Sequence, residues 1–169
     1  MFIDEISVNC GMTRLYARSK IGERVNDYVP DVRFERTSLI SSLRLNSDQV
    51  PFMFKGSLTG ELFRLYVRDE LPPTLNSGDI VILDNLSAHK VSGVLEPIYQ
   101  KEASVIFLPP YSPDLNPIEL AWSKVKAILR KLKPREYCEL LVDMKTALES
   151  ISLSDILGWF KFQGYGINI

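Results

Sequence analysis

The chain has 169 residues, of which 46% are hydrophobic and 24% charged, a composition typical of one globular domain with a full core. The formal net charge of −1 excludes a broadly basic protein, so any surface that binds nucleic acid must be local. No apolar run approaches the roughly eighteen residues of a membrane span, so we expect no membrane partner.

The N-terminal third of the sequence predicts strands separated by turns. Alternating or short apolar runs indicate four strands, at residues 2–8, 12–18, 37–46 and 50–56. We expect the first two to form a hairpin, because Cys10 and Gly11 suit a tight turn between them. The polar segment 21–36 is expected to be a loop.

Helix and strand patterns alternate in the rest of the chain. Spacing and apolar runs predict helix 59–71, strand 78–85, helix 90–101, strand 103–110, helix 116–132 and helix 135–150, followed by a short aromatic tail. Hairpin strands first and alternating helices and strands afterwards predict a mixed α/β sheet, in which crossover helices bring in parallel strands. We expect residues 1–169 to form a single domain.

Three acidic residues fall at functionally suggestive places in this topology. Asp4 shares a strand face with apolar residues, where an ionised carboxylate is costly unless it is paired or bound to a metal. Asp84 ends a buried strand, and open α/β sheets hold their sites at the carboxyl ends of parallel strands. Glu119 begins a helix after a proline-rich loop. A set of carboxylates without cysteine or histidine favours Mg²⁺ or Mn²⁺.

Each acid also has a purely structural interpretation. Asp4 could pair with an arginine such as Arg14, and Asp84 could cap the turn into the next helix. The segment FLPPYSPDLNPIELAW offers Asn116 as an N-cap, so Glu119 could complete a capping box. Local sequence leaves both kinds of role open.

Three segments, FIDE, VILDNLSAHK and LPPYSPDLNPIELAWSKVK, resemble the catalytic domain of the mariner superfamily of transposases, in particular its bacterial insertion-sequence branch of DDE superfamily endonucleases. Thirty-four residues lie between Asp84 and Glu119, the spacing of that branch, and GWFKFQGYGIN is similar to its closing segment. The resemblance implies a ribonuclease H-like fold and a transposase that cuts and joins DNA strands with two metal ions. Asp4, Asp84 and Glu119 would be the catalytic residues and metal ligands.

Three residues near these acids could assist them. Asn85 and Asn116 could hydrogen-bond to the ligand carboxylates, or could equally satisfy turn backbone. His89, the only histidine, could shuttle a proton or contact phosphate, and could equally be a capping or packing residue.

Residues 120–135 contain six basic side chains and no acidic one. The candidates for contacts to DNA phosphates are Lys124, Lys126, Arg130 and Lys133. Lys126 and Arg130 share the helix face of Glu119. A solvated helix face with cations near its C-terminus is an equally good interpretation.

Members of this family carry an N-terminal helix-turn-helix DNA-binding region, whereas only three residues precede Asp4 here. We therefore expect that region to be absent, and the chain to be a fragment, a split-frame product with a separate DNA-binding polypeptide, or a decayed copy. We expect a homodimer on double-stranded DNA in the bacterial cytoplasm, bound to the nucleoid, where Cys10 and Cys138 are reduced. An inactive remnant that binds DNA or dimerises with an intact transposase, and a ribonuclease H-like nuclease without strand transfer, are the alternatives.

Overall fold

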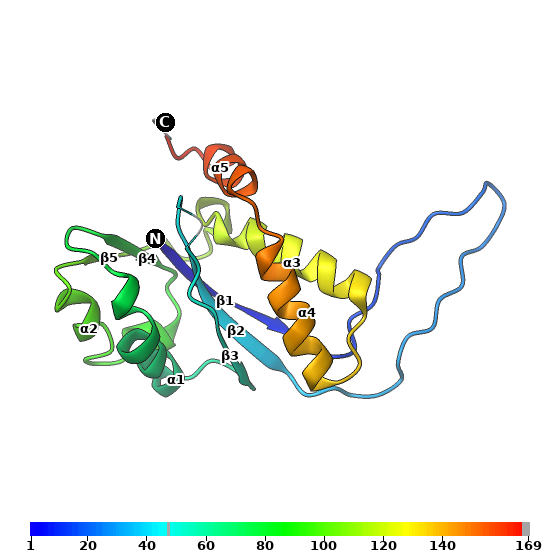
Figure 1. The fold of residues 1–169 in the computed structure, drawn as a ribbon, viewed down its shortest axis with the longest axis horizontal. Coiled ribbons are helices and arrows are strands. Elements are labelled where there is room, and N and C mark those ends of the chain that lie inside the picture. The colour runs from blue at the N-terminus through cyan, green and yellow to red at the C-terminus, as the bar shows by residue number, and fades with distance from the viewer. Residues whose placement is uncertain (47, 167–169) are drawn as a thin grey trace.

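The structure, a computed structural model that describes residues 1–46 and 48–166, is a mixed sheet with helices on both faces (Figure 1). Five strands lie in the order β3-β2-β1-β4-β5. They are β1 (Phe2–Val8), β2 (Thr37–Leu43), β3 (Phe52–Lys55), β4 (Ile80–Leu83) and β5 (Ser104–Phe107). β1, β2 and β3 pair antiparallel, and β4 pairs parallel with β1 and β5. The predicted mixed α/β sheet is therefore confirmed.

The helices divide between the two faces of the sheet. They are α1 (Gly60–Leu65), α2 (Glu96–Tyr99), α3 (Ile118–Leu132), α4 (Tyr137–Glu149) and α5 (Leu153–Phe162), with the shorter turns η1 (Tyr66–Glu70), η2 (Pro72–Thr74), η3 (Ser87–Lys90) and η4 (Pro113–Leu115). One face carries α1 and α2, and the other carries α3, α4 and α5 (Figure 1). None of the helices in the described residues is long and apolar enough to cross a membrane.

Alternation along β1 creates the two cores. Phe2, Ile6 and Val8 join the core under α3, α4 and α5, whereas Ile3 joins the core under α1 and α2. Asp4 follows the same alternation and therefore faces α3 rather than solvent. The strand pattern of residues 2–8 thus delivers one carboxylate into the interior, where only 5% of the residue is exposed.

The predicted strand at residues 12–18 is wrong. β2 and β4 occupy both edges of β1, so no edge is left for a hairpin partner. Residues 12–36 instead form a long excursion without helix or strand, which we call the arm (Figure 1). Apolar side chains on it, such as Leu15 and Tyr16, are exposed.

Two predicted helical regions also differ from the structure. The predicted helix 90–101 is broken: after η3, Gly93 adopts a positive φ of 73°, and only the short α2 follows. The predicted aromatic tail contains α5, which begins at a capping box between Ser152 and Asp155. Its Phe160 ring packs edge-on against Phe2, with 5.5 Å between the ring centroids, which ties the helix to β1. Residues 167–168 of the closing segment lie outside the described residues.

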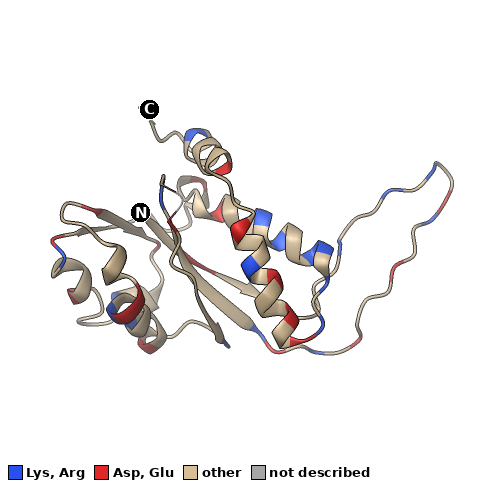
Figure 2. Ribbon diagram, viewed as in Figure 1, with Lys and Arg blue, Asp and Glu red and all other residues tan. Residues whose placement is uncertain are grey.

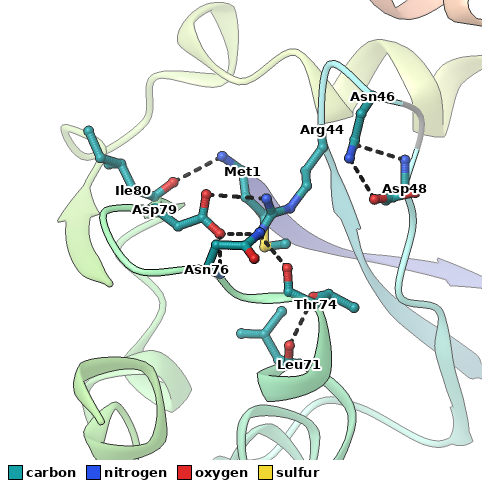
Figure 3. A network of polar contacts seen from close by, with 9 residues as sticks. All are labelled: Met1, Arg44, Asn46, Asp48, Leu71, Thr74, Asn76, Asp79 and Ile80. Atoms are coloured by element: carbon teal, nitrogen blue, oxygen red, sulfur yellow. Dashed lines mark hydrogen bonds and ion pairs between the residues drawn. The ribbon is translucent and has the colours of Figure 1, made fainter. Parts of the chain in front are cut away.

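A polar network fastens the end of β2 to the approach to β4 (Figure 3). The Arg44 guanidinium lies 2.6 and 3.2 Å from the carboxylate oxygens of Asp79, and it donates to the Thr74 carbonyl at 3.0 Å. The hydrogen bond from Arg44 lowers the pKa of Asp79. Because the contact is bidentate, it holds the approach to β4 firmly against the end of β2, with β1 between the two strands. The contact therefore helps to fix β4 beside β1, and with it the direction of the last residues of β4.

Candidate active site

Asp4, Asp84 and Glu119 line one pocket of about 560 Å³, which we call the carboxylate pocket. They come from β1, from the residue after β4 and from the first turn of α3, so the sheet and one crossover bring together three distant parts of the chain. The structure thus places the three predicted acids around one space. The segment from Asn85 to Lys90 after β4 and the proline-rich loop between β5 and α3 contribute the other lining residues.

Asp4 is held by buried donors. Its Oδ2 accepts hydrogen bonds from Trp122 Nε1 at 3.2 Å and from Asn116 Nδ2 at 3.4 Å. Burial, followed by the charges of Glu119 and Glu5, raises the pKa of Asp4 to about 8. The alternative pairing with Arg14 is wrong, because Arg14 lies on the exposed arm.

Asp84 is half-exposed at the end of β4 and has two partners. Its Oδ1 accepts from the Leu86 amide at 3.0 Å, so the turn-capping role exists. The same oxygen lies 2.8 Å from Nδ1 of His89. Burial acts to raise the pKa of Asp84, but the contacts with His89 and Leu86 outweigh it and lower the pKa. The carboxylate is therefore ionised and oriented, and both contacts engage Oδ1 rather than Oδ2.

Glu119 does not form the capping box that its position suggested. The Asn116 amide donates to the Pro113 carbonyl at 3.1 Å, closing the turn η4, so it is not available to the Glu119 carboxylate. α3 begins at Ile118 after Pro117, without a side-chain cap. Glu119 is exposed on the first turn, with its side chain lining the carboxylate pocket.

The two asparagines have different partners. Asn116 is buried and donates a hydrogen bond to Asp4. This contact is the one expected if Asn116 supports a ligand carboxylate. Asn85 instead donates from Nδ2 to the Leu108 carbonyl at 2.6 Å, which is the turn-backbone alternative. It joins the ends of β4 and β5 at the rim of the pocket.

His89 is fully buried between two carboxylates. Its Nε2 lies 3.9 Å from Oε2 of Glu5, on the opposite side from Asp84, and its ring lies 4.2 Å from that of Phe63 between centroids. The sequence interpretation missed Glu5, which alternation in β1 places on the other face from Asp4. Burial raises the pKa of Glu5, while the charge of His89 opposes that shift. In the sequence, the only signal for a role of Glu5 near the site is its position next to Asp4.

The donors in the carboxylate pocket suit a hard divalent cation, although they are not closed around one. Within residues 1–46 and 48–166, no three Asp, Glu, His or Cys side chains are arranged to hold a metal ion. Asn116, which lines this pocket, has a buried Oδ1 without a hydrogen-bond partner in the described part of the chain. A bound cation and its water would relieve both the mutual repulsion of the acids and the unsatisfied oxygen of Asn116.

The four candidate phosphate contacts divide into two pairs. Lys124 Nζ lies 2.6 Å from Asp155 and Lys133 Nζ lies 2.6 Å from Asp27, so both ammonium groups are in ion pairs within the chain. Lys126 and Arg130 line a second pocket, at the far end of β1 from the carboxylate pocket. Figure 2 shows the basic positions of α3 towards the end from which the arm leaves.

Comparisons with known proteins bear on this arrangement. The DDE superfamily endonuclease family model matches residues 1–140. No curated protein sequence matches the chain. Among solved structures, the pre-cleavage Mos1 transpososome is similar with a TM-score of 0.73 at 14% identity, over 97% of this chain and 52% of that chain.

Two further structures of the same protein are similar. The Mos1 mariner paired-end complex with Mn gives a TM-score of 0.71 at 15% identity, over 96% of this chain and 52% of that chain. The catalytic domain of Mos1 mariner transposase gives 0.60 at 12% identity, over 97% of this chain and 78% of that chain. The chain therefore spans about half the length of the first of these structures, and its fold is the ribonuclease H-like fold expected from the sequence.

Proposed function

The chain belongs to the DDE superfamily endonucleases, and on that premise we propose that it is the catalytic domain of a transposase, which cleaves DNA strands and joins them to new positions. Asp4, Asp84 and Glu119 hold a pair of Mg²⁺ or Mn²⁺ ions in this proposal. The observation that carries it is that these acids, from three separate elements, line one pocket at the end of β4. Structures of Mos1 with DNA ends and with Mn support it through the shared fold.

Each acid has a distinct role in holding the site. Asp4 is the fixed ligand, because Trp122 and Asn116 position its Oδ2 inside the core. Asp84 is oriented by His89, and Glu119 is carried by the end of a long helix, from which it can move towards the others. When bound, a metal pair activates water or a 3′ hydroxyl and stabilises the leaving oxygen.

The proposed substrate is double-stranded DNA, and two copies of the chain act on it together. The description of the Mos1 structures as a transpososome and as paired-end complexes supports this arrangement. A helix-turn-helix region, on a separate polypeptide or elsewhere in a longer one, would select the transposon ends. The reaction would take place on the bacterial nucleoid.

The direct test is strand cleavage by the purified chain. Supercoiled plasmid is incubated with Mg²⁺ or Mn²⁺, and nicked, linear and joined products are separated on gels. Wild-type protein should produce them and Asp84→Asn should not, because a neutral amide is a much weaker ligand for Mg²⁺ or Mn²⁺ than a carboxylate. Asp114→Asn is the matched control, since Asp114 is an exposed acid that does not line the carboxylate pocket.

Three results would contradict the proposal in different ways. Equal activity of Asp84→Asn and wild type would remove the metal-ligand assignment. Cleavage without any joined product, also with pre-cut ends, would favour a ribonuclease H-like nuclease. DNA binding without cleavage in either metal would favour an inactive remnant.

A further inference from the structure

A second pocket lies where β1 ends and the arm begins, and we call it the basic pocket. Its volume is about 520 Å³, and the cations that line it are Arg36, Lys126 and Arg130. Ser7 and Asn9 add polar groups, and no acidic side chain lines it among the described residues. Three cations around a hollow without a counter-charge favour an anionic ligand.

Arg36 is the fixed cation of this pocket. Its Nε donates to Ser7 Oγ at 2.7 Å, and its carbonyl accepts from the Gly56 amide at 2.8 Å, so side chain and backbone are both held by the sheet. The neighbouring acid, Glu35, lies 3.1 Å from Lys55 instead. Arg36 is therefore anchored through its Nε beside the pocket that it lines, and the planar fork of donors of a guanidinium suits a phosphate.

Close packing supports the floor of the basic pocket. A Cβ atom at Gly11 would lie 2.8 Å from the Phe34 ring, so the two ends of the arm meet closely at this point. Lys126 and Arg130 approach from α3, which packs along β1. The three cations thus come from α3 and from the junction of the arm with β2, and the core fixes α3 and β2 relative to each other.

The separation from the carboxylate pocket can be expressed in base pairs for a duplex that runs along α3. Lys126 and Arg130 follow Glu119 by seven and eleven positions, and a helix rises ~1.5 Å per residue, so they lie about 10 and 16 Å further along α3. Successive phosphates of one DNA strand are ~3.4 Å apart along the helix axis. The basic pocket is therefore roughly three to five base pairs from a phosphate held beside Glu119.

We propose that the basic pocket binds the DNA backbone about three to five base pairs from the scissile phosphate, with Arg36 as a phosphate contact. The proposal rests on DNA being the substrate of the carboxylate pocket. It adds Arg36, the last residue of the arm before β2, to the two cations of α3. It also gives the substrate a direction, along α3 from Glu119 towards the arm.

The test is the salt dependence of duplex binding, with Ca²⁺ present to prevent cleavage. Arg36→Ala, Lys126→Ala and Arg130→Ala should each reduce the log–log slope of affinity against salt by about 0.9. Arg33→Ala should leave it unchanged, because Arg33 is an exposed arm residue that does not line the basic pocket. Arg36→Lys retains the charge and should keep most of the slope, which separates lost charge from lost folding.

The outcomes are separable from those of the cleavage test. An unchanged salt slope in Arg36→Ala, or an equal loss of slope in Arg36→Ala and Arg33→Ala, would contradict DNA binding by the basic pocket. This would hold even if Asp84→Asn abolished cleavage. A wild-type protein that does not bind duplex at low salt would overturn it as well. Conversely, the expected slopes in a protein that never cleaves would support the basic pocket and contradict the proposed reaction.

Discussion

The indole Nε1 of Trp122 lies 3.2 Å from Oδ2 of Asp4, although 118 positions separate the two residues in the chain. This contact crosses from the second turn of α3 to the middle of β1, inside the core. It gives a buried carboxylate a fixed orientation before any cation binds. Placing a ligand in this way reduces the reorganisation that metal binding requires.

Trp122→Phe should weaken both the fold and the metal site. Removing a hydrogen bond to a buried, potentially charged group lowers the free energy of unfolding by about 1–3 kcal/mol. Loss of a group that orients a ligand should reduce Mn²⁺ affinity roughly 10-fold or more. Urea denaturation and Mn²⁺ titration of the purified chain measure the two effects.

Trp159→Phe is the matched control, because Trp159 is a half-buried α5 residue that does not line the carboxylate pocket. It should leave Mn²⁺ affinity unchanged. Equal Mn²⁺ affinity of Trp122→Phe and wild type would show that the indole serves only packing.

The metal-free protein should lose stability as the pH rises from about 4 to 8. The folded-state pKa of Asp4 is about 8 against its usual value of 3.8, so between these values the folded chain holds a proton that the unfolded chain releases. The free energy of unfolding should therefore fall by at most about 1.4 kcal/mol per pH unit from this group. The raised pKa of Glu5 acts in the same direction.

Thermal denaturation in EDTA at several pH values measures this slope. Asp4→Asn should flatten it, because that residue no longer titrates, and Mn²⁺ should flatten it in wild type by stabilising the ionised carboxylate. A wild-type slope that matches that of Asp4→Asn would contradict the buried, protonated Asp4.

Asp84→Asn should have the opposite pH signature. The pKa of Asp84 is lowered in the folded state, so its ionised carboxylate contributes stability above its usual pKa of 3.8, and that contribution is lost as the pH falls through the lowered value. At pH 7 the substitution should lower the free energy of unfolding by up to about 1 kcal/mol, a small effect because the side chain is half-exposed. The difference from wild type should vanish well below pH 4, which melting curves at pH 7 and pH 3 can check.

The sequence predicted the positions of these acids better than their surroundings. Alternation in residues 2–8 places Asp4 on an apolar face, and the apolar run before Asp84 predicts a buried strand ending there. Both features depend on local periodicity. The donors that hold Asp4, from Trp122 and Asn116, come from the other end of the chain, and no local pattern predicts which indole meets which carboxylate.

The wrong predictions have the same cause. Residues 12–18 have a reasonable strand pattern, but pairing depends on whether β1 has a free edge, and β2 and β4 occupy both. The capping box at Asn116 and Glu119 fits the helix signal, but η4 takes the amide that the box needs. Competition for a sheet edge therefore decided the first case, and competition from the adjacent turn decided the second.

The last prediction concerns Tyr111, which lies in the proline-rich loop beside the carboxylate pocket. Its φ of 56° is in the left-handed region and its side chain is fully exposed, so the conformation costs energy without any gain from burial. Tyr111→Gly relieves that strain, while the glycine makes the unfolded chain more flexible. We expect a net rise of up to about 1 kcal/mol in the free energy of unfolding, measured by urea denaturation.

The same substitution should impair the reaction. A fully exposed ring at the mouth of the carboxylate pocket is available for stacking on a base, worth about 1–3 kcal/mol, so duplex affinity or strand cleavage should fall. Tyr111→Phe should retain both, because the stacking face is unchanged. Tyr16→Gly is the control, since Tyr16 is also a largely exposed tyrosine but lies on the arm without positive φ, and it should not gain stability. A Tyr111→Gly protein that is more stable and fully active would show that the Tyr111 ring contributes neither to DNA binding nor to strand cleavage.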